Sequence, residues 1–361
     1  MRKIIQLLAV INMFCCSPEK VDEWQLIGFE KQDDVNPIMT PDTSSLFRDP
    51  ITQRLVKWEG KDVFNPASLV KDDTLFMLYR AEDFVGKYNG TSRIGLAFSF
   101  DGLNFTRLPQ PVFYPDEDEY KGLEWEGGSE DPRIVKREDG LYVMTYTAYD
   151  GNLARLLVAT TYDLRNWKKH GSVFQDSVDI NQWSKSGSIV SRSIDDELVA
   201  EKIDQKYWMY FGDTDLFIAQ SNDLIRWDPV KTETGEWLKV LSPRAGKFDS
   251  DLVEPGPPAI TTSNGILLIY NSRNRLADGD QTLPDGTYSA GQALFDPTNP
   301  IKLIRRSEDY FFTPDKPYEI TGQVNNVCFV EGLCHYKNQW FLYYGTADSK
   351  IAVAVSPQEL N

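Results

Sequence analysis

The sequence predicts an all-β protein, because one strand pattern recurs along the chain while signals for amphipathic helices are almost absent. The pattern is an apolar-aromatic strand, a turn, a second apolar strand ending in Ala-x-Ser or Ala-x-Thr, and then a turn of the type Asp-Leu-x-x-Trp. It begins near Leu75, Leu141, Tyr207, Ile266 and Trp340. Repeats of this length made only of strands are typical of a β-propeller with one blade per repeat. We therefore expect a five-bladed β-propeller with one central pocket.

The ten core strands of these repeats can be read directly from the sequence. They are expected at 75–79 and 94–98, 141–146 and 156–160, 207–211 and 216–220, 266–270 and 290–294, and 340–344 and 351–355. The first three repeats also carry the turn motif, at 101–105, 163–167 and 223–227, and the last two are weaker copies.

The first sixteen residues resemble an export signal. Arg2 and Lys3 form a basic region, and the apolar run at 4–14 is too short to span a bilayer. Cys15 and Cys16 follow directly, as in bacterial lipoproteins, although small residues usually precede such a cysteine and do not do so here. We expect an exported bacterial protein, in the periplasm or at the outer membrane as a lipoprotein, with either cysteine as the lipidated one.

Behind the signal, residues 17–60 form a polar lead-in that includes Pro37, Pro41 and Pro50. We expect this lead-in to pack on the propeller or to close its last blade, because the edges of sheets need cover. The propeller itself, which we expect to be the catalytic domain, would occupy residues 61–361.

Composition excludes several classes of function. The 361 residues carry a formal charge of −16, which argues against nucleic acid, and the only expected membrane contact is the lipid anchor. The chain has no phosphate-binding motif of the Walker or Rossmann type. Cys328, Cys334 and His335 do not make a zinc site, so we expect no metal and no other cofactor. The two cysteines are expected as buried thiols in neighbouring strands, with a hairpin disulfide as the alternative. The oligomeric state is left open.

Polar residues at strand ends would face the mouth of a propeller, and five clusters of them stand out. They contain Asn65 and Ser68; Glu130, Asp131 and Arg133; Asp213; Glu254; and Asp348. Several carboxylates around one pocket suit glycosidic bond cleavage, in which one protonates the leaving oxygen and another activates water or attacks the sugar. Carboxylates in turns also cap strands and pair with Arg, but the glycines before Asp131 and the prolines after Glu254 favour a functional role.

With these motifs the chain resembles glycoside hydrolase family 130, the mannoside phosphorylases and β-mannosidases, over about residues 48–361. The resemblance rests on six segments in the family's order, at 64–66, 129–133, 146–151, 254–258, 318–322 and 343–348. It implies that Asp131 is the acid, acting on the glycosidic oxygen through a hydroxyl of the sugar itself. It also implies that Asn65, Ser68 and Asp348 contact a mannosyl unit in the −1 subsite. The remaining candidate substrate ligands are Arg80, Glu130, Arg133, Tyr149, Asp150, Arg155, Lys185 and Asn271.

The open question is whether water or phosphate receives the sugar. A phosphorylase needs a cationic cradle, and the resemblance places its Arg, Lys and His at Gly212, Leu252 and Asn271, none of which is cationic. Asp213 and Glu254 stand there instead, and two anions would repel phosphate by several kcal/mol at short range. The same two carboxylates could hold and deprotonate a water.

We therefore expect an exported, inverting β-mannosidase that acts on mannose-containing oligosaccharides, with β-1,2 as the expected linkage. Asp131 would be the acid and Glu254, assisted by Asp213, the base, although the family's hydrolytic branch leads us to expect Glu at position 213. A mannoside phosphorylase that releases mannose 1-phosphate is the alternative, because Arg80, Arg93, Arg133, Arg155 and Lys185 remain as anion ligands. A non-catalytic glycan-binding propeller is a further alternative. Substrate length and the +1 subsite are left open.

Overall fold

The computed structural model describes residues 24–85 and 90–358, and in these residues the regular structure is almost entirely β. Helical structure in the described residues is limited to the short elements α1 (Lys121–Glu124), α2 (Pro317–Ile320) and a 3-10 turn at Asp179–Asn181. The prediction of an all-β protein is therefore confirmed. Over the same residues, no helix is both long and apolar enough for a membrane span. The expected export signal, with Cys15 and Cys16, lies outside the described residues.

Five units of antiparallel strands follow one another along the chain. The first contains β4 (Asp62–Lys71), β5 (Thr74–Glu82), β6 (Ser92–Ser99) and β7 (Thr106–Arg107). The second contains β8 (Gly128–Lys136), β9 (Tyr142–Tyr149), β10 (Ala154–Thr161) and β11 (Lys168–Ser172). The third contains β12 (Ser188–Ile189), β15 (Lys202–Ile203), β16 (Lys206–Phe211), β17 (Leu216–Ser221), β18 (Trp227–Pro229) and β19 (Lys239–Leu241).

The last two units complete the series. The fourth contains β20 (Leu252–Pro255), β21 (Ile260–Thr262), β22 (Gly265–Arg273), β23 (Tyr288–Phe295) and β24 (Leu303–Arg306). The fifth contains β25 (Cys328–Tyr336), β26 (Gln339–Thr346), β27 (Lys350–Ser356) and, from the start of the chain, β1 (Glu30–Lys31). Two short pairs are β2 (Phe47–Arg48) with β3 (Leu55–Val56), and β13 (Ser191–Ile194) with β14 (Glu197–Ala200).

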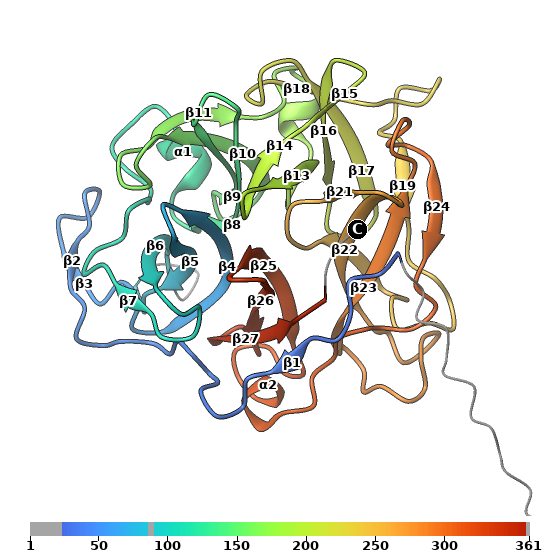
Figure 1. Cartoon of the computed structure of the whole chain (residues 1–361). Coiled ribbons are helices and arrows are strands. Elements are labelled where there is room, and N and C mark those ends of the chain that lie inside the picture. Colours follow the sequence, from blue (N-terminus) through green and yellow to red (C-terminus); the bar gives the residue numbers. More distant parts are fainter. Residues whose placement is uncertain (1–23, 86–89, 359–361) are drawn as a thin grey trace, which may run out of the picture.

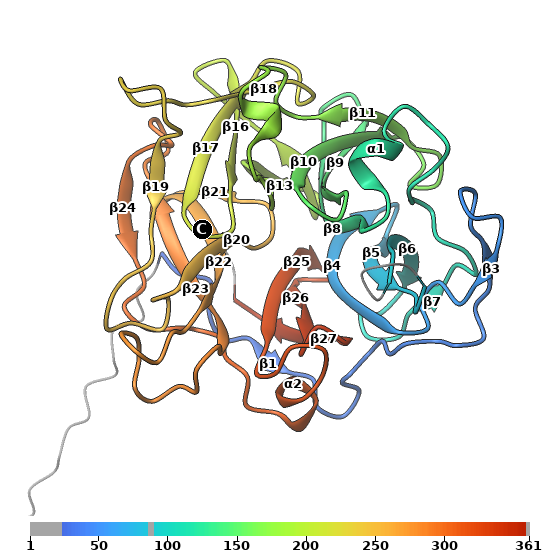
Figure 2. The same cartoon turned by 180° about the vertical axis from the view of Figure 1, so that it is seen from behind.

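The five units lie side by side around a common centre, with β4, β8 and β25 on the inner side (Figures 1 and 2). β4 contacts both β8 and β25. Short parallel bridges add hydrogen bonds between units, such as the one between Ser92 of β6 and Gly128 of β8. Residues from separate units are therefore brought together at the inner strands.

The core lies between the units rather than inside any one of them. Five buried apolar clusters each combine side chains of two units: first with second, second with third, third with fourth, fourth with fifth, and fifth with first. In β26, Phe341 and Tyr343 pack in the cluster shared with the first unit, whereas Leu342 and Tyr344 pack in the cluster shared with the fourth. Alternate side chains of a strand point to opposite faces, so both faces are buried and the strands read as nearly continuous apolar runs.

The recurring Asp-Leu-x-x-Trp motif is a capped turn. In its second copy, the Thr161 hydroxyl accepts from the backbone N–H of Asp163 (3.1 Å) and Leu164 (3.1 Å). The Asp163 carboxylate in turn accepts from the backbone N–H of Asn166 at 2.8 Å, and the Trp167 indole N–H donates to the Leu164 carbonyl at 3.3 Å. The third copy repeats these bonds from Ser221 to Trp227. Such side-chain turns satisfy backbone donors that no strand partner can reach.

The lead-in joins the end of the chain. β1 pairs antiparallel with β27, with Glu30 opposite Val355. Just before it, the backbone of Leu26 exchanges two hydrogen bonds with the buried amide of Gln292, at 2.9 and 2.7 Å. The Lys31 ammonium group lies 2.7 Å from the buried Glu319 carboxylate. One short segment therefore holds the fourth and fifth units at once.

Candidate active site

The site begins at two β-bulges on inner strands. The pairing of β4 shifts between Phe64 and Pro66, and the pairing of β8 shifts between Glu130 and Arg133. Asn65 and Asp131, at the bulges, have φ values of 45° and 49°, in the left-handed region that Asn and Asp tolerate better than most residues. Bulges redirect side chains, and here the Asn65 amide N–H donates to the Asp131 carboxylate at 2.9 Å. The Asn65 amide oxygen is buried and has no partner among the described residues.

Arg80 of β5 connects three carboxylates beside these bulges. Its guanidinium group donates to Asp131 at 3.1 Å, to Glu130 at 3.0 Å and to Glu82 at 2.7 Å. Burial by itself would raise the pKa of Asp131, but Arg80, Lys185 and the Asn65 amide together hold it well below its ordinary value. Burial raises the pKa of Glu130 to about 7, with Arg80 opposing and Asp131 adding to the shift. The two carboxyl groups therefore influence each other's protonation, with one protonation step near pH 7.

Glu254 of β20 is the second buried carboxylate of the site, with 5% of its surface exposed. The Ser186 hydroxyl donates to its carboxylate. Burial raises the pKa of Glu254; Lys185 opposes this rise and Asp213 adds to it. The interaction with Asp213 places these two carboxylates in one neighbourhood.

Lys185 lies between the part of the site around Asp131 and the part around Glu254. Its ammonium group is 3.8 Å from the Asp131 carboxylate. Burial alone would lower the pKa of Lys185, but Glu254, Asp131 and the other nearby carboxylates raise it above its ordinary value. Lys185 is thus a cation that interacts with both Asp131, the predicted acid, and Glu254, the predicted base.

Aromatic side chains stand beside Asp213. The Trp183 indole N–H donates to the Asp213 carboxylate at 2.7 Å, and the Trp183 ring lies 6.4 Å from the Tyr149 ring. Trp183 is 47% exposed, which is unusual for so large an apolar side chain. An exposed ring next to polar groups is a surface on which the apolar face of a sugar can stack.

Asp348 approaches the same region from the fifth unit. It follows β26 in a turn, with φ of 50°. Burial raises the pKa of Asp348 to about 7, while Arg80 opposes and Asp131 adds to the rise. Asp348 is therefore close enough to both residues to interact electrostatically with them.

Beneath these groups, a buried arginine ties the two halves of the site together. The Arg133 guanidinium group donates to the carbonyls of Gly256 (2.7 Å), Pro255 (2.6 Å) and Asp131 (3.2 Å). It lies 3.5 Å from the carboxylate of Glu331, which is fully buried at a third bulge, in β25. Burial raises the pKa of Glu331 far above its ordinary value, and Arg133 only partly opposes this rise. Arg133 is thus a link between β8 and the segment that follows Glu254.

A cavity of about 370 Å³ opens at this end of the inner strands. Arg80, Glu82, Glu130 and Tyr149 are among its lining residues. The volume falls in the usual range for ligand pockets, about 300–1,000 Å³. The Arg80 network therefore faces an opening that can admit a small sugar.

Several predicted substrate ligands have other contacts. Asn271 exchanges two hydrogen bonds with the backbone of Val330, at 2.9 and 2.7 Å. Arg155 pairs with Asp150 at 2.7 Å. Ser68 is buried, and its hydroxyl lies next to Gly332 of β25. Direct contact of these four polar residues with a substrate stays a prediction.

The sequence did not single out Glu82, Trp183, Ser186 or Glu331. Only Glu331 carries a signal that could have been used, because it interrupts the apolar run of β25. Over the described residues, no group of three or more His, Cys, Asp and Glu side chains is arranged to hold a metal ion. Cys328 and Cys334 are buried free thiols. They lie on the one strand β25, so the expectation of neighbouring strands was wrong and no hairpin disulfide is formed.

Comparisons with known proteins were made over the whole chain. The profile of glycoside hydrolase family 130, described as β-1,4-mannooligosaccharide phosphorylase, matches residues 30–360. A 1,2-β-oligomannan phosphorylase from Thermoanaerobacter sp. (strain X514) is 33% identical over 309 residues, covering 83% of this chain and 91% of the relative.

Two solved structures are similar over nearly their full length. A glycosyl hydrolase from Bacteroides ovatus is 45% identical, with a TM-score of 0.91, over 95% of this chain and 97% of that one. The description of the other structure states that the GH130 family of mannoside phosphorylases contains glycoside hydrolases that target β-1,2-mannosidic linkages in Candida mannan. It is 44% identical, with a TM-score of 0.91, over 94% of this chain and 98% of that one.

Proposed function

Because the chain belongs to glycoside hydrolase family 130 and is thereby an enzyme of β-mannosides, we propose that it cleaves β-1,2-mannosidic linkages by inverting hydrolysis. The observation that carries this proposal is the pair of carboxylates Glu254 and Asp213, which stand where a phosphorylase would need cations. Glu254 is buried, and its pKa is raised partly by Asp213. A phosphate dianion placed beside them would meet the same repulsion more strongly.

The cations near the site are largely committed to other groups. Arg80 binds three carboxylates, Arg133 binds backbone carbonyls, and Arg155 is paired with Asp150. Lys185 is surrounded by anions. Little positive charge is left over to form a cradle for phosphate, which supports water as the acceptor.

In the proposed mechanism, Glu254 removes a proton from a water that attacks the anomeric carbon, with Asp213 helping to hold that water. The leaving oxygen takes a proton from a hydroxyl of the sugar. Asp131 then gives a proton to that hydroxyl oxygen. In the free protein the pKa of Asp131 is low and that of Glu130 is about 7. The proton that Asp131 delivers is therefore stored on the pair that it forms with Glu130. Attack from the face opposite the leaving group inverts the anomeric centre.

The phosphorylase alternative has its own support. The curated relative from Thermoanaerobacter is named as a phosphorylase, and so is the family profile. These names favour phosphorolysis more directly than hydrolysis. The solved structures favour hydrolysis, because one is named a glycosyl hydrolase and the other is described with hydrolases of β-1,2-mannosides.

Proton NMR of the reaction with β-1,2-mannobiose, with and without phosphate, separates the candidates. Hydrolysis by inversion predicts α-mannose as the first product at a rate that phosphate does not change. Mannose 1-phosphate that accumulates only with phosphate would establish the alternative. Binding of the sugar without turnover in either condition would indicate the non-catalytic, glycan-binding function.

The arrangement of the units and the cellular location are also part of the proposal. Five blades of one propeller would require a core between the fifth and first units, and the cluster shared by Phe341, Tyr343, Met77 and Tyr79 fits that requirement. Export as a lipoprotein rests on Cys15 and Cys16 behind the apolar run at 4–14.

A further inference from the structure

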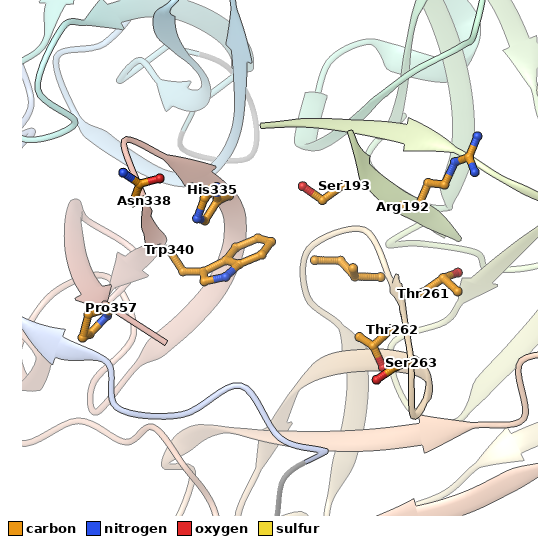
Figure 3. A pocket seen from close by; sticks show the side chains of 10 residues that line it. Arg192, Ser193, Thr261, Thr262, Ser263, His335, Asn338, Trp340 and Pro357 are labelled. Carbon is orange, nitrogen blue, oxygen red and sulfur yellow. The ribbon is translucent and has the colours of Figure 1, made fainter. Parts of the chain in front are cut away.

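A second cavity, of about 490 Å³, lies away from the candidate active site. It is formed by β13, β21, the ends of β25 and β26, and Pro357 (Figure 3). His335 lies four residues beyond Glu331 on β25, which is about 13 Å along a strand. Asp348 follows β26 at the end where Thr346 pairs with Cys328, whereas His335 pairs with Trp340 at the other end. The two cavities are thus separated along the inner strands.

Four polar side chains of this cavity have no hydrogen-bond partner in the described part of the chain. The side chains of Arg192, Ser193 and Asn338 form no hydrogen bond or ion pair with any other described residue. The Thr261 hydroxyl is buried and also has no partner there. The cavity therefore offers a guanidinium group, an amide and two hydroxyls, which together both donate and accept.

The floor of the cavity is aromatic and held in place. The His335 and Trp340 rings lie 5.2 Å apart, and Trp340 is 3% exposed. The Asp196 carboxylate pairs with Nδ1 of His335, which leaves Nε2 as the second polar atom of the ring. Figure 3 shows His335 and Trp340 on one side of the opening, and Arg192, Ser193 and Thr261 on the other.

These features point to a neutral ligand that is rich in hydroxyl groups. A phosphate would meet one uncommitted guanidinium group and the nearby Asp196, in a protein of net charge −16. An apolar ligand would leave the four polar side chains without partners, which is costly. None of the described lining residues carries a carboxylate, so the acid and base of glycoside cleavage are missing.

We propose that Arg192, Thr261, His335 and Asn338 form a second, non-catalytic carbohydrate-binding site, which takes a mannosyl unit of a longer oligosaccharide. The choice of mannose rests on the proposed function, whereas the site itself does not. Such a site would hold a chain on the protein while another chain is being cleaved.

The test uses indole N–H signals of the full, ¹⁵N-labelled chain during titration with β-1,2-mannotriose. All titrations use the Asp131→Asn variant, in which cleavage is slow. The indole signals of Trp183 and Trp340 are assigned by replacing each Trp by Phe. Trp183 then reports on the active site and Trp340 on the second site. Both signals are expected to shift. With Arg192→Ala and Asn338→Ala combined, the Trp340 response should weaken at least tenfold while the Trp183 response stays. Arg54→Ala, at an exposed arginine of the lead-in, should leave both unchanged.

The outcomes separate this inference from the proposed function. A silent Trp340 signal, or a Trp340 response that survives the double substitution, would overturn the second site. A Trp340 response with a silent Trp183 signal and no turnover by the parent protein would support the second site while contradicting the proposed function. An equal Trp340 response to cellotriose would reject mannose as the ligand and keep the neutral-sugar class.

Discussion

Among single residues, Lys185 has the most demanding position, because it balances carboxylates on both sides of the site. A buried ammonium group is stable only when anions compensate for its lost hydration. Asp131 and Glu254 fill that role here, and in return the charge of Lys185 lowers the pKa of each carboxyl group against the effect of burial. The charge states of the proposed acid and base are therefore linked through one cation.

Glu254→Gln is expected to remove the base while preserving the shape of the site. Because a positioned base contributes on the order of 10²–10⁴ in rate, kcat on β-1,2-mannobiose should fall by that factor while KM changes only a few-fold. Glu308→Gln, at an exposed glutamate paired with Lys247, serves as the matched control and should keep full activity. Retention of more than a tenth of the activity by Glu254→Gln would contradict its role as base.

The pair Glu130 and Asp131 sets the pH dependence. The pair must hold its proton to protonate the leaving group, and the pKa of Glu130 is about 7. We expect kcat/KM to fall as the pH rises through about 7, because the stored proton is lost. On the acid side it should fall as Glu254 becomes protonated.

Glu130→Gln removes the stored proton but keeps an oxygen for the guanidinium group of Arg80. We expect this variant to lose on the order of 10²-fold in kcat/KM and to lose the alkaline limb of the pH profile. Glu82 also binds Arg80, and its pKa is lowered by Arg80 and Lys61 although burial opposes this shift. Glu82→Gln should therefore keep the alkaline limb, and an unchanged profile in Glu130→Gln would assign that limb to another group.

Among the elements, the inner strands β4, β8 and β25 share one irregularity. Each carries a β-bulge at a buried polar residue: Asn65 in β4, Asp131 in β8 and Glu331 in β25. A regular strand would alternate these side chains between the two apolar faces, where a polar group is costly. A bulge interrupts this alternation, so these three side chains need not point into either apolar face.

Arg133 is the link between two of these elements, and Arg133→Met should break it. The change leaves the carbonyls of Pro255 and Gly256 without their donor and Glu331 without its cation. A buried acceptor left without its donor typically costs about 1–3 kcal/mol. Two carbonyls lose their donor here, so the free energy of unfolding in urea should fall by about 2–6 kcal/mol.

Glu331→Gln is the informative companion variant. Burial raises the pKa of Glu331 far above its ordinary value, which favours the neutral acid, and Gln reproduces the charge of that form. We expect kcat within about threefold of wild type and a loss of stability below about 1 kcal/mol. A loss as large as that of Arg133→Met would mean that Glu331 is ionised in the folded protein.

The strands and their turns were predictable because their causes are local. Apolar runs mark the buried strands, and the turn from Thr161 to Trp167 is closed by its own side chains. Asn65, Asp131 and Glu254 could be found because glycine or proline adjoins them. Ser186 and Trp183 could not, since their place depends on tertiary contacts: Ser186 contacts Glu254 of the fourth unit, and Trp183 contacts Asp213 and Tyr149. Arg133 was predicted as a substrate ligand, and its bonds to Pro255 and Gly256 could not be foreseen because those two partners are more than 120 residues away.

For the whole molecule, the lead-in should contribute strongly to stability. Deletion through Gln32 removes the buried side chains of Trp24 and Leu26, the partner of Gln292, and the cation paired with Glu319. Each buried apolar side chain contributes about 1.5–3 kcal/mol, so we expect a loss of at least about 3–5 kcal/mol in urea unfolding. A chain that starts at Val21 is the control and should be as stable as the longer form. Equal stability of both truncations would show that β1 is dispensable.

The pairing of β1 with β27 also constrains how the protein is made. A ribosome releases a chain from its N-terminus, and Glu30 of β1 pairs with Val355 of β27, more than 300 residues later. β1 must therefore wait for its partner while the strands between them are made. The fifth unit cannot acquire its outer strand, nor the first unit its shared core, before that moment. A growing chain of this design therefore stays incomplete until β27 has emerged, and β1 remains without its partner strand over that whole interval.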